Sequence, residues 1–398
     1  MSELSFDILC DVLKLLPVKS LLRFRCLSKE LCSLIDSPDF INLHLSQSNH
    51  TNTNRSLVAF QPHIWPNMST YMIDLDFLDY QRMECDLFSE NSIITYYYDH
   101  SKNLAIFGSC NGLIALYHPN QGMLLWNPST KKQRKLPDFW VGHEVCDPDY
   151  ILDGFGYDCI SDDYKVVRIR IGHKRSRVMV YSVKRNSCRV IEEFPYNFIH
   201  SGSKRRCGTL VGSCLHWIVS KSGYSADPRI VAFNLEDERY QTVPIPDLKT
   251  ASGANYMLQQ IGVVGGCLSM SMHADENGFL EEIWVMKEYG IRESCARIFS
   301  VFRPDSGFEN YMRPFVKSIE YSKFGDKVSL NVHGYRFWVY ELQDEEQTSH
   351  SQVNQPPYVP EKRLERLKIE TLELTTSCDN SFICVRSLVP VNFDAQQS

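Results

Sequence analysis

The feature that most constrains the fold is a short phrase that recurs about every 50 residues. It consists of an apolar strand, then Asn, Asp, Glu or Ser, then turn residues, as in "LWNPST" (125–130) and "AFNLEDE" (232–238). Aligning one residue in each of six copies gives spacings of 53, 55, 52, 52 and 55. Because one such unit cannot cover both faces of its own strands, neighbouring units are expected to stack. The aligned residues are Ile73, Trp126, Tyr181, Phe233, Val285 and Tyr340.

A period near 50 residues with several short strands per unit is typical of a kelch-like β-propeller, in which each unit is one blade. We predict this propeller over residues 57–392, with six blades favoured and five or seven left open. The tail "SFICVRSLVPV" (381–391) is predicted to complete the last blade or to pair with the first. The polar stretch 343–361 is predicted to be a flexible loop.

Three segments predict how single strands are covered. "GLIALY" (112–117) and "VVGGCLSM" (263–270) are apolar on both faces, which indicates strands enclosed between neighbouring units. "VVRIRI" (166–171) alternates instead, so we expect Arg168 and Arg170 to lie on a face open to water.

The amino-terminal segment has a different pattern, which predicts short helices. Residues 7–16 read as one helix whose polar strip is narrow, so its apolar surface is about twice the roughly 100° stripe that packing on one neighbour requires. Ser20 and Ser28 are predicted to cap a second and a third helix, and Ser37 with Pro38 to start a fourth. This helix pattern therefore indicates two surfaces to be covered.

The apolar content of this segment exceeds what it can bury alone. Between Leu4 and Leu45, 23 of 42 residues are apolar, and a unit of roughly 40 residues is marginal by itself. Two explanations follow from composition: the helices dock on the rest of the chain, or they form an interface for another protein. Composition favours neither strongly.

Residues 4–45 resemble an F-box, the module that attaches substrate receptors to the Skp-type adaptor of cullin-based SCF ubiquitin ligases. The resemblance is carried by the Ile8-Leu9 and Val12-Leu13 pairs, "LPVKSLLRFRCLSK" (16–29) and "SLIDSPDFI" (33–41). It departs from the usual pattern at Ser5, where proline is normal, and at Leu31, where an aromatic residue is common. It implies an F-box at 1–45. The stretch that follows, 46–56, is rich in Asn, Ser and Thr, and this composition predicts a polar linker. The implied adaptor-binding residues are Leu4, Ile8, Leu9, Leu13, Leu16, Pro17, Leu21, Leu27 and Leu31.

The rest of the chain resembles the F-box-associated domain of the large plant F-box family. The segments "FGYDCISDDYKVVRI" (155–169), "LWNPSTKKQRKLP" (125–137), "IWVMKEYGIRESCARIFSV" (283–301) and "MRPFVKSIEYSKFGDKVSL" (312–330) carry this likeness. That family includes S-locus F-box proteins and F-box regulators of immune receptors. The expected fold class is therefore mainly β with a small α domain, a three- to four-helix F-box followed by a kelch-like propeller.

Charge and cysteine content exclude several classes of protein. The net charge of −6 argues against a general nucleic-acid binder, since phosphate contacts require a basic surface. No run of 18 apolar residues occurs, so we expect no membrane insertion. The acidic first residues lack the basic start of a secretory signal, and fourteen cysteines without CxxC pairs fit reduced thiols. We therefore expect the cytoplasm, the nucleus or both.

No pattern predicts catalysis, a metal site or a cofactor. "GSCNG" (108–112) lacks the GxSxG order of a nucleophile loop and predicts a turn at Gly112. His143 and Cys146 have the spacing of a metal pair, but no second pair follows. His216 beside Trp217 is predicted to be a hydrogen-bonded core histidine. The sequence thus predicts a non-catalytic protein.

Two features are candidates for binding a protein substrate. Trp65 and Trp140 lie in loop-like contexts, where tryptophan is a frequent interface anchor, although either could fold against its own blade. Residues 164–189 hold nine Lys or Arg and no acid, which indicates either an acidic partner or a solvated blade edge. Lys174, Arg175 and Arg177 are the residues predicted to contact such a partner.

Together these observations predict a substrate-recognition subunit of an SCF-type ubiquitin ligase. The F-box would bind the Skp-type adaptor and, through it, the cullin and RING subunits, while the propeller holds an unidentified target for ubiquitination and degradation. The alternatives are a propeller that binds a ligand or glycan, with the helices as a structural cap, and an F-box protein that does not promote degradation.

Overall fold

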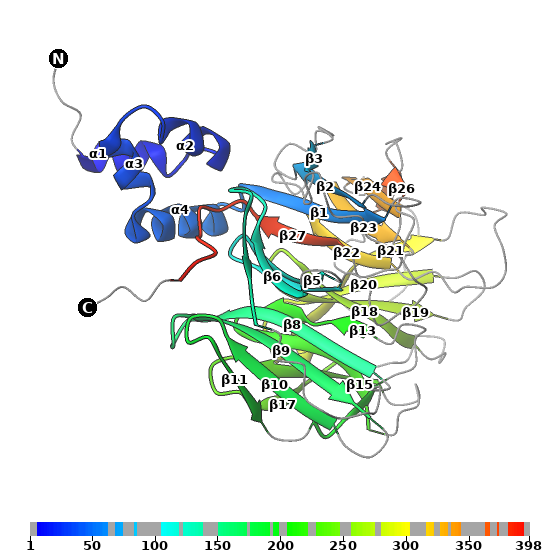
Figure 1. The fold of residues 1–398 in the computed structure, drawn as a ribbon. Helices are drawn as coiled ribbons and strands as arrows, with labels where there is room; N and C mark the ends of the chain where they lie inside the picture. Colours follow the sequence, from blue (N-terminus) through cyan, green and yellow to red (C-terminus); the bar gives the residue numbers. More distant parts are fainter. Residues whose placement is uncertain are drawn as a thin grey trace.

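The structure is a computed structural model. It describes residues 6–62, 68–74, 83–85, 105–118, 122–137, 150–172, 176–191, 194–198, 205–221, 228–246, 256–274, 280–302, 316–321, 327–332, 336–343, 363–366, 372–373 and 381–393. Helices occupy the start of the chain and strands the remainder, so the mainly β class with a small α region is confirmed (Figure 1).

Four α-helices form the amino-terminal region: α1 (Phe6–Leu13), α2 (Val18–Phe24), α3 (Lys29–Ile35) and α4 (Pro38–His50). Two predicted caps are confirmed, since the hydroxyl of Ser28 accepts from the Leu31 amide at 3.1 Å and that of Ser37 from the Phe40 amide at 3.3 Å. The predicted cap at Ser20 is wrong. Helix α2 already begins at Val18, because Pro17 in an extended conformation stands at the cap position.

The predicted linker at 46–56 is mostly regular structure. Helix α4 continues through His50 and strand β1 begins at Arg55, so only residues 51–54 connect them. Asn52 and Asn54 turn the chain with positive φ angles of 51° and 58°, a conformation that asparagine tolerates well. The Asn54 side chain is buried and donates from Nδ2 to Ser48 Oγ at 2.9 Å. The connection is thus a hydrogen-bonded turn instead of a polar hinge.

The strands within the described ranges form six sheets. The first contains β27 (Ser381–Val385), β1 (Arg55–Pro62), β2 (Met68–Asp74) and β3 (Met83–Cys85). The second contains β4 (Ala105–Cys110), β5 (Leu113–His118), β6 (Gly122–Asn127) and β7 (Lys132–Lys135). The third contains β8 (Tyr150–Asp158), β9 (Asp163–Ile171), β10 (Ser176–Ser182), β11 (Ser187–Ile191) and β13 (Arg205–Cys207).

The other three sheets follow in chain order. The fourth contains β12 (Asn197–Phe198), β14 (Thr209–Val211), β15 (Cys214–Ser220), β16 (Pro228–Asn234) and β17 (Tyr240–Val243). The fifth contains β18 (Tyr256–Val264), β19 (Cys267–Ala274), β20 (Leu280–Met286) and β21 (Cys295–Phe302). The sixth contains β22 (Val316–Tyr321), β23 (Lys327–Val332), β24 (Arg336–Gln343), β25 (Arg363–Arg366) and β26 (Leu372–Glu373).

Each of the six aligned repeat residues lies in a different sheet. The strands that carry them are β2, β6, β10, β16, β20 and β24, and each lies next to the last strand at one end of its sheet's main path. The repeat in the sequence is therefore a repeat of structure.

The two ends of the strand region share one sheet. Strand β27 pairs antiparallel with β1, from Arg55 opposite Val385 to Ala59 opposite Ser381, so the prediction that the tail pairs with the first unit is confirmed. The inner strands of successive sheets contact one another, and β22 of the sixth sheet contacts β27 of the first. The six-blade count stays a prediction, and most of the predicted loop at 343–361 lies outside the described residues.

The helices lie at one end of the sheets. Arg55, at the start of β1, follows directly from the helical region, whereas Pro62 pairs with Met68 at the opposite end of the same sheet. In the third sheet, the ring of Tyr164 near the β8–β9 turn lies 5.3 Å from that of Phe393, which follows β27 on the helix side. The end of the first sheet where Pro62 pairs with Met68, and the end of the third sheet where Ile171 pairs with Ser176, therefore lie away from the helices.

Strand burial corrects two predictions. Leu113–Leu116 of β5 are fully buried as expected, but "VVGGCLSM" is not one strand, because Gly265 and Gly266 form the turn between β18 and β19 with φ of 57° and 76°. The expected wet face of β9 is wrong as well, since Arg168 is buried there.

Candidate protein-binding site

Helix α1 has two apolar faces. One face turns inward: Leu13 is 3% exposed, and Leu9 packs half-buried against the same core. The other face carries Ile8 and Val12, each 52% exposed and four residues apart, so both lie on one side of the helix. The sequence prediction that this helix has two surfaces to cover is confirmed, and one of them has no cover in the described part of the chain.

Other apolar side chains of the helical region are exposed as well. Leu15, in the turn after α1, is 64% exposed, and Leu27, in the turn before α3, is 68% exposed. Apolar side chains left in water forgo a burial free energy of roughly 1.5–3 kcal/mol each, so such a surface is expected to be an interface. We call the exposed set Ile8, Val12, Leu15 and Leu27 the helical apolar surface.

The predicted adaptor-binding residues divide into three groups. Ile8, Pro17 and Leu27 are exposed, and Leu9, Leu16 and Leu31 are half-buried around the helical core. Leu13 and Leu21 are 3% and 0% exposed, so their assignment to the adaptor surface is corrected: they are core residues of the four helices. Leu4 lies outside the described residues.

Sequence reasoning missed Val12 and Leu15 as surface residues. The signal is present, because Val12 follows Ile8 by one helical turn, on a face about 100° around the helix from that of Leu9 and Leu13. Pattern alone did not identify which of the two apolar faces meets the chain's own core.

Two polar contacts, one buried and one at the surface, fix the helices relative to one another. His44 on α4 is almost fully buried, and its Nε2 lies 2.9 Å from the carbonyl oxygen of Leu16. Burial lowers the pKa of His44, so the imidazole is neutral and Nε2 donates this bond. Arg25 joins Asp36 at 2.5 Å, which ties the end of α2 to the end of α3.

Residues 1–43 match the family model of the F-box domain, and residues 80–322 match that of the F-box associated beta propeller domain. The second match alone covers more than half of the chain. The chain belongs to the F-box proteins with an associated β-propeller. The F-box implies binding to a Skp-type adaptor.

Known F-box proteins align along most of the chain. The chain is 31% identical over 374 residues to F-box protein CPR1 of Arabidopsis thaliana, covering 88% of this chain and 84% of that protein. It is 28% identical to F-box protein At4g22390 and 27% identical to F-box/kelch-repeat protein At3g23880 of the same organism. These alignments cover 81% and 78% of this chain, and 80% and 82% of those proteins.

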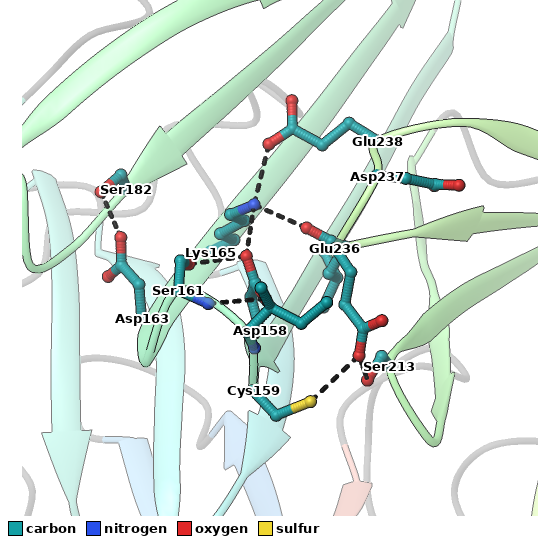
Figure 2. A network of polar contacts seen from close by, with 12 residues as sticks. Asp158, Cys159, Ser161, Asp163, Lys165, Ser182, Ser213, Glu236, Asp237 and Glu238 are labelled. Atoms are coloured by element: carbon teal, nitrogen blue, oxygen red, sulfur yellow. Dashed lines mark hydrogen bonds and ion pairs between the residues drawn. The ribbon is translucent and has the colours of Figure 1, made fainter.

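We call residues 164–189 the basic tract. Some of its positive charges are paired with acidic side chains of the same protein. Lys165 on β9 is buried, and its Nζ lies 2.8 Å from Asp158 Oδ2 and 2.9 Å from Glu238 Oε1 (Figure 2). The same ammonium donates to the carbonyl oxygen of Leu235 at 2.6 Å. Glu238 also pairs with Arg189. One carboxylate from the turn between β16 and β17 thus serves two of the nine basic residues.

Two further charges of the tract are paired. Arg168 donates from Nε to Asp153 Oδ1 at 2.6 Å, with both groups buried, and its guanidinium lies 4.9 Å from the ring centroid of Phe107. Lys184 pairs with Asp162 at 2.7 Å on the surface. At least four of the nine basic residues, all within the described ranges, therefore have acidic partners inside the protein, which weakens the prediction of an acidic partner for the tract as a whole.

The predicted substrate-binding residues lie mostly outside the described part of the chain. These are Trp65, Trp140, Lys174 and Arg175, whereas Arg177 on β10 is exposed. The strands that flank Trp65 approach each other at Pro62 and Met68, and those that flank Lys174 and Arg175 at Ile171 and Ser176. Both places are at the end of the sheets away from the helices.

The described residues hold no group of three or more His, Cys, Asp or Glu side chains that could bind a metal ion. The predicted turn at Gly112 is confirmed, with φ of 82°, whereas Gly108–Cys110 belong to β4; burial raises the pKa of the Cys110 thiol to about 12. His216 is confirmed as a core residue: its ring nitrogens contact the Thr209 carbonyl at 3.0 Å and the Tyr289 hydroxyl at 2.6 Å. No helix within the described ranges is long and apolar enough to cross a membrane.

Proposed function

We propose that this F-box protein is the substrate-recognition subunit of an SCF-type ubiquitin ligase. The observation that carries the proposal is the helical apolar surface, which lies inside the segment that matches the F-box. The protein's own core occupies the other face of α1, so Ile8 and Val12 are available to an adaptor.

The proposed mechanism is proximity. The F-box binds the Skp-type adaptor and, through it, the cullin and RING subunits, while the far end of the sheets holds a target protein. A target lysine then meets the activated ubiquitin at a high effective concentration. The bond-forming chemistry belongs to the partners, as is typical of F-box proteins, and the target is degraded.

We place the protein in the cytoplasm, the nucleus or both, in keeping with the free thiols of its described cysteines.

Comparative mass spectrometry tests this function. The wild-type protein and an Ile8→Asp, Leu27→Asp variant are purified from plant cells treated with a proteasome inhibitor. The expected result is that both retain the same target protein, whereas only the wild type retains the adaptor and cullin, and that the target accumulates under inhibition. If the abundance of the target changes neither with the inhibitor nor in cells that carry the variant, a role in degradation would be contradicted.

A further inference from the structure

The last described residues of the chain lie between the helices and the sheets. After β27, residues 386–393 form an extended segment that runs along α4 (Figure 1). We call residues 386–391 the carboxy-terminal strut. Its side chains Ser387, Leu388, Val389 and Val391 are all buried, whereas Pro390 is exposed.

One strut residue belongs to the core of the F-box helices. Leu388 is 8% exposed and lies in the same apolar cluster as Leu13, Leu21 and Ile35. This cluster otherwise consists of residues from α1 to α4 and the turns between them. The helical unit, which is too small to enclose its apolar residues alone, thus receives a core side chain from the other end of the chain.

The neighbouring strut residues join α4 to the second sheet. Val389 and Val391 pack with Leu45 of α4 in a cluster that also contains residues of β4, β5 and β6. Alternate strut positions therefore face two cores, Leu388 that of the helices and its neighbours that of the sheets.

Hydrogen bonds hold the strut to the turns of the second sheet. The side-chain amide of Asn127 donates to the carbonyl oxygens of Ser387 at 3.1 Å and Val389 at 2.8 Å. Ser387 in turn donates to the Asn111 carbonyl at 2.7 Å. At the other side, Arg386 donates from its amide to the Asn54 carbonyl at 2.6 Å and from Nε to Ser56 at 2.7 Å. The strut is therefore anchored on two sheets and on the turn after α4.

We propose that the carboxy-terminal strut is a positioning element of the F-box: Leu388 completes the helical core, and the anchored segment holds the helices in one orientation on the sheets. The adaptor-binding unit then depends on residues more than 340 positions away from it in the chain. An effect of the strut on adaptor affinity rests on the proposed function. Its effect on the packing of the helices does not.

Hydrogen exchange of the full-length protein tests the proposal. In Leu388→Ala, the amides of α1–α3 are expected to exchange at least about tenfold faster, because the lost side chain leaves a cavity in a small core. Amides of β8–β10, which do not contact Leu388, should exchange at wild-type rates. Asn392→Ala, an exposed neighbour, is the matched control and should leave all rates unchanged.

Two truncated chains test whether the faster exchange comes from loss of the strut or from general misfolding of the protein. A chain that ends at Phe393 should behave as the wild type, and one that ends at Val385 should lose helix protection more strongly than Leu388→Ala. Unchanged exchange of α1–α3 in both Leu388→Ala and the chain ending at Val385 would overturn the proposal. If the helices lose protection from hydrogen exchange in these variants but the wild type binds no Skp-type adaptor, the proposed role of the strut is supported and the proposed function is contradicted.

Discussion

The ammonium of Lys165 lies 2.8 Å from the carboxylate of Asp158, and both side chains are less than 10% exposed. The two residues stand on either side of the β8–β9 turn, at the end of the sheets that faces the helices. Glu238, from the next sheet, pairs with the same ammonium, so the network joins the third sheet to the fourth.

Removing the central cation of this network should destabilise the protein strongly. Lys165→Met leaves Asp158 and Glu238 buried without their shared partner, and such a loss costs about 3–5 kcal/mol. Lys184→Met is the matched control, since its exposed pair with Asp162 contributes at most about 1 kcal/mol. The measurement is the urea midpoint of each variant. Equal midpoints would show that the buried network adds no more than a surface pair.

The same network predicts loss of stability in acid. Burial raises the pKa of the Asp158 carboxyl, but hydrogen bonds from Lys165 and Ser161 outweigh it and lower the pKa from 3.8 to about 2. Because the folded protein holds this carboxylate ionised more strongly than the unfolded chain does, the contribution is present above pH 4 and is lost as the pH falls toward 2.

The change is measured as unfolding midpoints between pH 5 and pH 2. Asp158→Asn should be less stable than the wild type at pH 5 and should have a shallower decline over this range. An identical decline in the two proteins would assign the acid sensitivity to other groups.

The contact between the strut and the second sheet predicts a difference between two glycines. Gly112 and Gly266 both have positive φ, 82° and 76°, so alanine at either is strained by about 1–2 kcal/mol. At Gly112 a Cβ would also stand 2.1 Å from Ser387 Oγ, whereas at Gly266 it would meet nothing within 4 Å. Gly112→Ala should therefore lower the thermal midpoint at least twice as far as Gly266→Ala. Equal shifts of the thermal midpoint in the two variants would mean that the strut moves away from the added methyl group at little cost in stability.

The two faces of α1 should respond differently to truncation. Leu13→Ala removes a buried side chain and is expected to cost about 2–5 kcal/mol, whereas Val12→Ala on the exposed face should change stability by no more than about 0.5 kcal/mol. Hydrogen exchange of α2 and α3 reports this difference. Comparable loss of protection in both variants would place Val12 in the core.

Much of the architecture was readable from the sequence because its signals are local. The repeat spacing places each aligned residue in the strand next to one end of a sheet, and the serines before Lys29 and Pro38 mark the starts of α3 and α4. These features depend on strand length, turn residues and capping hydrogen bonds, all of which lie within a few residues of each other.

The failures concern contacts between distant parts of the chain. The basic tract contains no acidic residue of its own, but Lys165 and Arg189 pair with Glu238 of the next sheet. The polar linker was expected to be loose, but Asn54 is fixed by Ser48 on one side and Arg386 on the other. A pattern of residue types predicts which groups need partners and does not say where in the fold those partners stand.

The most direct test of the account is the affinity of the full-length protein for a recombinant Skp-type adaptor from Arabidopsis thaliana, measured by calorimetry. The wild type is expected to bind, and Ile8→Asp with Leu27→Asp to lower the affinity at least about 100-fold at an unchanged thermal midpoint, since a carboxylate buried without a partner is costly. Ile291→Asp, at an exposed apolar position in the connection between β20 and β21, should bind as the wild type does. A wild-type protein with no affinity, or a double variant that binds equally well, would contradict the assignment of the helical apolar surface.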